Sequence, residues 1–158
     1  MKYHHILLLA FGIFLVASYF LGYTPVAFGV LFLIVSLKAY FLYAKDKAAA
    51  KVGSWRVPEN ALHVVALLFG WPGALIAQER LRHKTKKQSF RVFFWLTVLV
   101  NLGGVAWLHS PQGNSLLREG VHQFENFAVS NLPHRVSDST VLFFTDFRNK
   151  GPGDYANK

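Results

Sequence analysis

Apolar segments separated by short polar stretches dominate the first two thirds of the chain. Three of them are long and hold at most one charge each: residues 6–21, 25–43 and 90–107. Runs of this length and polarity are typical of membrane-spanning helices, so we expect each to cross a membrane. The Ala-rich residues 44–51 have high helix propensity and should extend the second helix until Gly53 and Ser54 end it. Pro58 then opens a new helix.

A further apolar segment, residues 61–77, contains Gly70, Trp71, Pro72 and Gly73 at its middle. As one helix it would reach about 25 Å, slightly less than a hydrocarbon core of about 30 Å. Both flanks are basic, and a single crossing would leave one basic loop outside, against the positive-inside rule. A re-entrant hairpin that turns at Trp71 and Pro72 keeps both loops inside, whereas a kinked crossing is the frequent outcome of an intramembrane proline. Both arrangements stay open, and we favour the re-entrant or strongly broken form.

The tail from Asn114 onward has a different character. Apolar residues repeat there at helical spacing: Leu117, Val121, Phe124 and Ala128. The repeat predicts an amphipathic helix over residues 115–130. Residues 140–147 are expected to form a short strand or an interfacial segment. Because a tail of roughly forty residues buries little core alone, we expect it to lean on the membrane or on a partner protein.

These patterns predict an all-α integral membrane protein. Residues 1–109 would form a membrane helical domain with three full transmembrane helices plus the Gly/Pro-broken segment, and residues 110–158 a small extramembrane tail. The N-terminal run reads as an uncleaved anchor, because a second apolar run follows almost at once. We expect a multi-pass protein of the bacterial inner (cytoplasmic) membrane with its N-terminus in the cytoplasm. The tail would be periplasmic, or cytoplasmic if residues 61–77 cross fully.

Charge is distributed unevenly along the chain. Residues 1–108 hold 12 Lys/Arg and 3 Asp/Glu, a difference of +9, whereas residues 109–158 hold 5 of each. The excess positive charge therefore belongs to the membrane part, where it sets topology and meets anionic lipid. The chain has no cysteine, which excludes disulfides, thiolate metal sites and cysteine nucleophiles.

The densest basic run is the candidate site for anionic lipid head groups: Arg80, Arg82, His83, Lys84, Lys86 and Lys87. Nucleic acid is not expected as a partner, because residues 80–89 hold no aromatic side chain on which bases could stack. A second group of polar residues precedes it: Asp46, Arg56, Glu59 and His63. Arg56 is expected to pair with a carboxylate and order the loop, in preference to a catalytic role for the carboxylate.

Glu59 and His63 are spaced i, i+4 and share a helix face. The pair could poise a base or supply two metal ligands, but we favour an interfacial histidine hydrogen-bonded to Glu59. A metal site needs at least three protein ligands, and His83 lies among cations, so we expect no metal and no cofactor. No catalytic residue is assigned.

Four stretches carry a family resemblance. They are YAKDKAAA at residues 43–50, WRVPENALH at 55–63, GWPGA at 70–74 and RHKTKKQSF at 82–90. With these motifs in this order, residues 26–107 resemble the bacterial membrane family catalogued as domain of unknown function 1294. Members often show two glycines before Trp-Pro-Gly, where this chain has Phe69 and Gly70. The resemblance implies no established activity.

The function expected from the sequence is a non-enzymatic module whose basic cytoplasmic face binds anionic lipid head groups or a partner protein. One alternative is a membrane enzyme acting on a phosphorylated or lipid substrate, with His63 or His83 as acid or base. Another is an accessory subunit of a larger membrane complex, with the tail contacting a protein partner.

Overall fold

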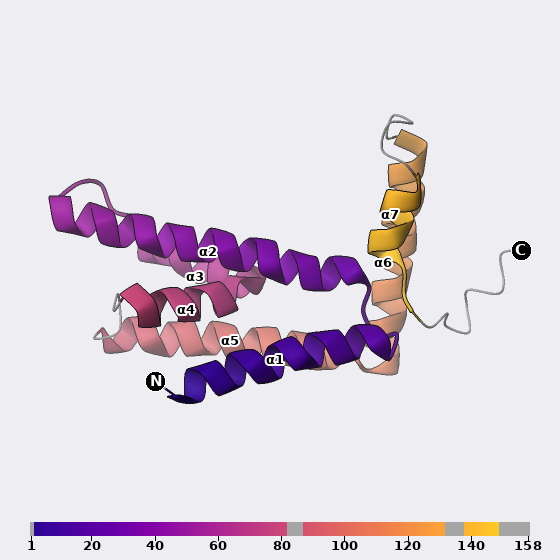
Figure 1. The fold of residues 1–158 in the computed structure, drawn as a ribbon, viewed down its shortest axis with the longest axis horizontal. Coiled ribbons are helices and arrows are strands. Elements are labelled where there is room, and N and C mark those ends of the chain that lie inside the picture. Colours follow the sequence, from indigo (N-terminus) through magenta and orange to yellow (C-terminus); the bar gives the residue numbers. More distant parts are fainter. Residues whose placement is uncertain (1, 82–86, 132–137, 149–158) are drawn as a thin grey trace, which may run out of the picture. The chain divides into compact units, whose positions relative to one another are not determined.

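A computed structural model describes residues 2–81, 87–131 and 138–148, and every element within these ranges is helical (Figure 1). The elements in order are α1 (Lys2–Phe20), α2 (Val26–Val52), α3 (Glu59–Val65), η1 (Ala66–Gly70), α4 (Trp71–Leu81), α5 (Gln88–Leu108), α6 (Pro111–Asn131) and α7 (Asp138–Thr145). Four helical segments are long and apolar enough to cross a membrane: Tyr3–Phe20, Val26–Val52, Glu59–Leu81 and Gln88–Leu108. The predicted all-helical class with several membrane-length helices is confirmed to this extent.

The helices form two compact units. The first unit comprises Met1–Leu8 and Val30–Gly104, and the second comprises Leu9–Gly29 and Val105–Lys158. Three of the long helices, α1, α2 and α5, each contribute one part to each unit.

In the first unit, α2 continues through the Ala-rich stretch as predicted and ends at Val52. Gly53 follows with a φ of 65°, a left-handed conformation that glycine adopts without steric cost. The Ser54 backbone N–H then donates to the Ala49 carbonyl at 3.1 Å, which satisfies one of the carbonyls at the helix end. Pro58 occupies the position before α3, as expected from its missing N–H.

The apolar segment from Glu59 to Leu81 is broken inside η1. Leu68 (φ −84°, ψ 50°) and Phe69 (φ 71°, ψ 0°) both leave the helical conformation. α4 then starts at Trp71, so Pro72 lies in its first turn, where no intrahelical N–H bond is lost. Figure 1 shows α4 returning toward the end of the first unit at which α3 begins.

Two glycines let the broken segment pack closely on α2. A Cβ at Gly73 would overlap the backbone carbonyl of Ser36, and one at Gly70 would lie 3.1 Å from the Val35 carbonyl oxygen and from the Ala39 Cβ. Neither position has room for a side chain. Small residues thus bring the start of α4 into backbone contact with α2, as in closely packed membrane helices.

Asn101 of α5 faces the break. Its Nδ2 donates to the Leu67 carbonyl at 2.8 Å and to the Thr97 carbonyl of its own helix at 2.9 Å. The break leaves helix carbonyls without their usual donors, and the buried Asn101 amide supplies one. At Gly103 and Gly104 of the same helix, a built Cβ meets no atom of the described residues within 4 Å.

In the second unit, the turn between α1 and α2 is held by a buried polar cluster. The Ser18 hydroxyl lies 2.8 Å from the Thr24 hydroxyl and 2.9 Å from His109 Nε2. His109 Nδ1 lies 2.8 Å from the Val105 carbonyl, which can only accept. In the neutral ring, Nδ1 therefore carries the proton and Nε2 accepts from Ser18.

The amphipathic helix predicted over residues 115–130 is confirmed, and it begins earlier, at Pro111. The Ser110 hydroxyl accepts the Gly113 backbone N–H at 3.1 Å, which caps the helix, and Pro111 suits its first position. A Cβ at Gly113 would overlap the Trp107 carbonyl, so the start of α6 lies directly against the end of α5.

The strand alternative for residues 140–147 is wrong, because Asp138–Thr145 forms helix α7. A short apolar run without alternation does not distinguish helix from strand. Here Val141 and Thr145 lie one helical turn apart, and both line the surface where α7 faces α6. Packing on α6 therefore determines the helix.

Candidate functional site

Charged side chains of the first unit are concentrated where its helices end. The segments concerned are the end of α2, the loop that leads into α3, the end of α4 and the start of α5. Long basic side chains suit such positions, because they reach water while the helix bodies stay apolar. We call this the polar end of the first unit, and its described members are Lys45, Asp46, Lys47, Lys51, Arg56, Glu59, Glu79, Arg80, Lys87 and Arg91.

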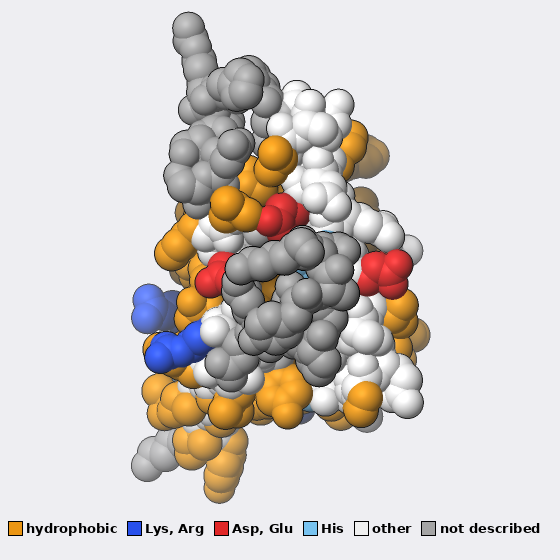
Figure 2. Space-filling view, turned by 90° about the vertical axis from the view of Figure 1, so that its right-hand side faces the viewer, with side chains coloured by type: hydrophobic (Ala, Val, Ile, Leu, Met, Phe, Trp, Pro, Cys, Tyr) orange, Lys and Arg blue, Asp and Glu red, His pale blue; other side chains and the backbone are white. Residues whose placement is uncertain are grey.

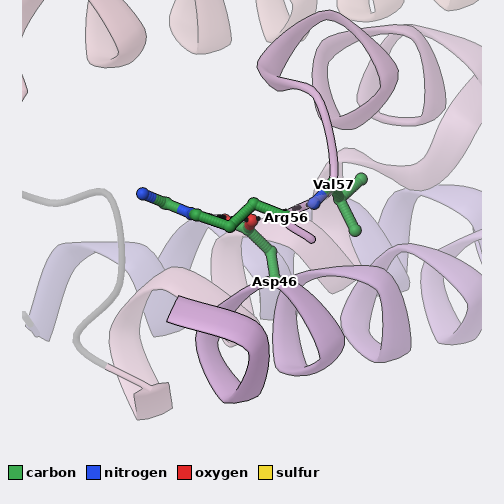
Figure 3. Close-up of polar contacts among 3 residues, drawn as sticks. All are labelled: Asp46, Arg56 and Val57. Carbon is green, nitrogen blue, oxygen red and sulfur yellow. Dashed lines mark hydrogen bonds and ion pairs between the residues drawn. The ribbon is translucent and has the colours of Figure 1, made fainter. Parts of the chain in front are cut away.

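Asp46 is the buried centre of this polar end. Its side chain rises from α2 toward the loop that carries Arg56 and Val57 (Figure 3), and it is fully removed from solvent. Arg56 Nε and Nη2 lie 3.4 Å from Oδ1 and Oδ2 respectively, and the Val57 backbone N–H donates to Oδ1 at 3.1 Å. The expected pair between Arg56 and a carboxylate therefore forms. It joins the loop before α3 to α2 through two-point contact.

Two further contacts join helix ends. Lys87 Nζ, at the start of α5, lies 2.7 Å from Glu59 Oε2 in the first turn of α3. Lys47 Nζ of α2 donates to the Leu81 carbonyl, the last residue of α4. The start of α3 is thereby held to the start of α5, and the end of α4 to the last third of α2.

The N-terminal part of α1 contributes a contact between a histidine and a carboxylate to the first unit. His5 Nε2 lies 3.5 Å from Glu79 Oε1 of α4. The His5 side chain is largely exposed, whereas that of Glu79 is nearly buried. The sequence prediction missed this pair because its partners lie far apart in the chain and no local pattern links them.

His63 lies among aromatic rings. Its ring centroid is 4.3 Å from that of Phe90 and 5.9 Å from that of Phe93, both on α5. Phe90 also meets the buried ring of Tyr43 from α2, at 6.2 Å. His63 is therefore half-buried between α3 and α5, and its ring contacts suit a structural role.

Of the residues predicted to bind anions, the structure describes Arg80 and Lys87, and both are exposed. Arg82, His83, Lys84 and Lys86 lie outside the described residues. The second predicted group, Asp46, Arg56, Glu59 and His63, is described in full, and its members belong to α2, α3 and the loop between them. Among the residues that the structure describes, no three His, Asp or Glu side chains are grouped so as to hold a metal ion.

Comparison with known proteins places these elements in a family. Residues 36–90 match the family described as Protein of unknown function (DUF1294). The chain is also similar to the Uncharacterized protein YsdA of Bacillus subtilis (strain 168), with 30% identity over 78 residues, which cover 49% of this chain and 88% of YsdA. No solved structure matches the chain. The family suggested by the four sequence motifs is confirmed, and the chain belongs to the DUF1294 family of proteins of unknown function.

Proposed function

We propose that this protein is a non-enzymatic module of the bacterial inner membrane whose basic polar end binds anionic lipid head groups. The observation that carries the proposal is that its carboxylates contact basic side chains of other segments. Two of the three carboxylates among residues 1–108 lie against a cation of another segment, Asp46 with Arg56 and Glu59 with Lys87. The third, Glu79, lies 3.5 Å from the His5 ring. These contacts join the helices and the loop of the first unit, which is a structural use of the carboxylates.

Cations remain exposed once these pairs are formed. Lys45, Lys51, Arg80 and Arg91 are all exposed on the polar end. Residues 45–91 hold 10 Lys/Arg and 3 Asp/Glu, a difference of +7, which gives these segments a strong positive potential. Each cation near an anionic surface contributes about 1 kcal/mol to binding, so the charge suits lipid head groups.

We further propose a topology with three full crossings, α1, α2 and α5, and a re-entrant hairpin built from α3 and α4. The break at Leu68 and Phe69 leaves arms of nine and twelve residues, about 14 and 18 Å long at 1.5 Å per residue. Each arm reaches about halfway through a core of about 30 Å. The contacts of Glu59 with Lys87 and of Lys47 with Leu81 support a return to the side of entry.

Lipid contact is supported by the apolar surface of the long helices. On α1, the side chains of Ile6, Leu9, Ile13 and Val16 are 57–68% exposed, although all are apolar. Contiguous apolar surface of this kind is typical of a surface that faces lipid and not water. The proposed orientation puts the N-terminus and both basic segments in the cytoplasm, as the positive-inside rule requires.

Single cysteines test the topology, since the chain has none of its own. Ser54, Ser89 and Ser115 are exposed and provide sites before α3, at the start of α5 and in α6. A membrane-impermeant maleimide should label Ser54→Cys and Ser89→Cys only in inverted vesicles, and Ser115→Cys only in intact spheroplasts. Opposite labelling of the first two would refute the re-entrant hairpin.

Lipid binding is tested on the full chain, purified in mild detergent, delipidated and titrated with phosphatidylglycerol or phosphatidylcholine. Replacing Lys84 and Lys86 by Gln should weaken phosphatidylglycerol binding roughly fivefold for each lysine, at about 1 kcal/mol per charge. Salt of about 1 M should mimic the loss by screening. Arg148→Gln, in the second unit, is the control and should change little. Equal affinity for the two lipids, or a tightly bound protein that excludes lipid, would refute the proposal.

A further inference from the structure

A groove runs along the second unit where α6, α7 and the first turn of α2 meet. α6 and α7 pack side by side (Figure 1), and Pro25 and Ala27 of the α2 segment complete the groove. Its volume is about 500 Å³. None of the polar end of the first unit takes part in it, so it is a separate feature of the chain.

The groove walls are chemically suited to hydrocarbon. Its lining holds no charged side chain, and its polar side chains are two threonines, Thr140 and Thr145. The Thr145 hydroxyl donates to the Val141 carbonyl at 2.9 Å within α7, so that hydroxyl is already used. Phe124 and Phe144 contribute aromatic surface, and both remain well exposed. A polar ligand would lose its hydration here without gaining partners.

The position of the groove in the second unit indicates that lipid acyl chains are the apolar groups nearest to it. Arg118 Nη2 donates to the Gly22 carbonyl at 2.6 Å and Asn114 Nδ2 to the Tyr23 carbonyl at 2.8 Å, so α6 is held to the turn between α1 and α2. A turn between two membrane-spanning helices lies at the membrane surface. α6 is amphipathic, and Phe127, 65% exposed, lies on its apolar side. Such a helix at this level lies in the interface, beside lipid acyl chains.

Hydrophobic side chains also reach the surface on one face of the molecule. Figure 2 shows them at several places among polar surface, with few charged side chains in view. Exposed apolar surface of this kind is a site of association in soluble proteins and a lipid contact at a membrane.

We propose that the groove receives one acyl chain of a phospholipid from the adjoining leaflet. At roughly 30 Å³ for a water-sized group, a volume of about 500 Å³ holds roughly sixteen such groups. This is enough for one long acyl chain and not for two. The inference rests on the membrane location in the proposed function, and it does not depend on the basic polar end.

Gly120 allows a clean test. It lines the groove, and a Cβ built there meets no atom of the described residues within 4 Å, so a leucine side chain would start in open space and occupy part of the groove. Gly12 of α1 has the same clearance and provides the matched control. Both substitutions replace a helical glycine by leucine, so both should favour the helix to a similar extent.

The full chain would be reconstituted in bilayer nanodiscs of phosphatidylethanolamine and phosphatidylglycerol. A trace of phosphatidylcholine with a photoactivatable diazirine in one acyl chain would serve as the probe. After irradiation, peptide mass spectrometry should find lipid adducts at Val121 and Phe144. Gly120→Leu should reduce these adducts at least fivefold, whereas Gly12→Leu should not. Adducts at the exposed Ile13 of α1 should persist in both variants and report ordinary membrane contact.

Equal groove adducts in the parent chain and Gly120→Leu would overturn the inference, as would cross-links from the groove to a second copy or another protein. Absence of adducts at Ile13 as well would refute the membrane location itself and, with it, this inference. Circular dichroism of both variants should match the parent chain, which confirms that the groove variant is folded.

Discussion

Arg56→Ala should destabilise the first unit by about 2 kcal/mol. Removing one partner of a fully buried ion pair costs about 3–5 kcal/mol, whereas exposed pairs contribute about 0–1 kcal/mol. Asp46 is fully buried, but the Arg56 side chain is 51% exposed and both of its contacts to the carboxylate are long, at 3.4 Å. The expected loss lies between the two limits. For a chain of this size it corresponds to a melting temperature lower by about 4–8 °C.

The same geometry predicts an asymmetry between the two partners. Arg56→Ala leaves a buried carboxylate without the guanidinium, whereas Asp46→Asn leaves a half-exposed guanidinium that water can solvate. In Asp46→Asn the Val57 N–H can still donate to the side-chain oxygen, so we expect a cost of about 1 kcal/mol. The double variant should be more stable than Arg56→Ala alone, because no buried charge remains.

Thermal unfolding in mild detergent, followed by circular dichroism, measures both effects. Lys51→Ala is the matched control, because Lys51 is an exposed cation at the end of α2 and should stay within about 0.5 kcal/mol of the parent. Equal melting temperatures for Arg56→Ala and Lys51→Ala would refute the role of the pair. A double variant less stable than Arg56→Ala would refute the argument from the stranded charge.

Three further predictions concern the break and can be measured by the same unfolding assay. Gly73→Ala should cost more than about 3 kcal/mol or prevent folding, because its Cβ would overlap the Ser36 carbonyl, whereas Gly12→Ala should be tolerated. Asn101→Leu should cost about 0.6–1.7 kcal/mol, the range for hydrogen bonds between membrane helices, and no change would show that the freed carbonyl needs no donor. Phe69→Gly should be more stable than Phe69→Ala by about 1 kcal/mol, because alanine keeps the strain of a φ of 71°; the opposite order would contradict the left-handed conformation.

Local patterns predicted the helices and several of their ends. The end of α2 at Gly53 and the start of α3 after Pro58 follow from the conformations that these two residues adopt. The pair of Arg56 with a carboxylate was also predictable, because an arginine in a short loop beside a charged helix end has few partners within reach. The broken segment followed from Gly70, Trp71, Pro72 and Gly73, although the break itself falls at Leu68 and Phe69.

Contacts between distant segments were not predictable from one sequence. The Asn101 amide donates to the Leu67 carbonyl, 34 residues earlier in the chain, and no local pattern links the two. Close approach occurs at Gly70 and Gly73, where the i, i+3 spacing of glycines was the available signal. The helical state of α7 in the second unit was not predicted for a similar reason. Its short sequence alone is compatible with helix or strand, and its packing on α6 favours the helix.

The segment that matches the family begins and ends at residues that contact the broken segment of the first unit. It begins at Ser36, whose carbonyl lies against Gly73, and ends at Phe90, on which His63 packs. Between these limits lie both partners of the pair between Asp46 and Arg56. The matched segment is therefore the broken hairpin together with parts of the helices that hold it, whereas α1, α6 and α7 lie entirely outside it. The matched segment thus holds the hairpin and most of the polar end. Filling the α6–α7 groove should consequently leave phosphatidylglycerol binding at the polar end unchanged, because the two sites use different residues and different chemistry.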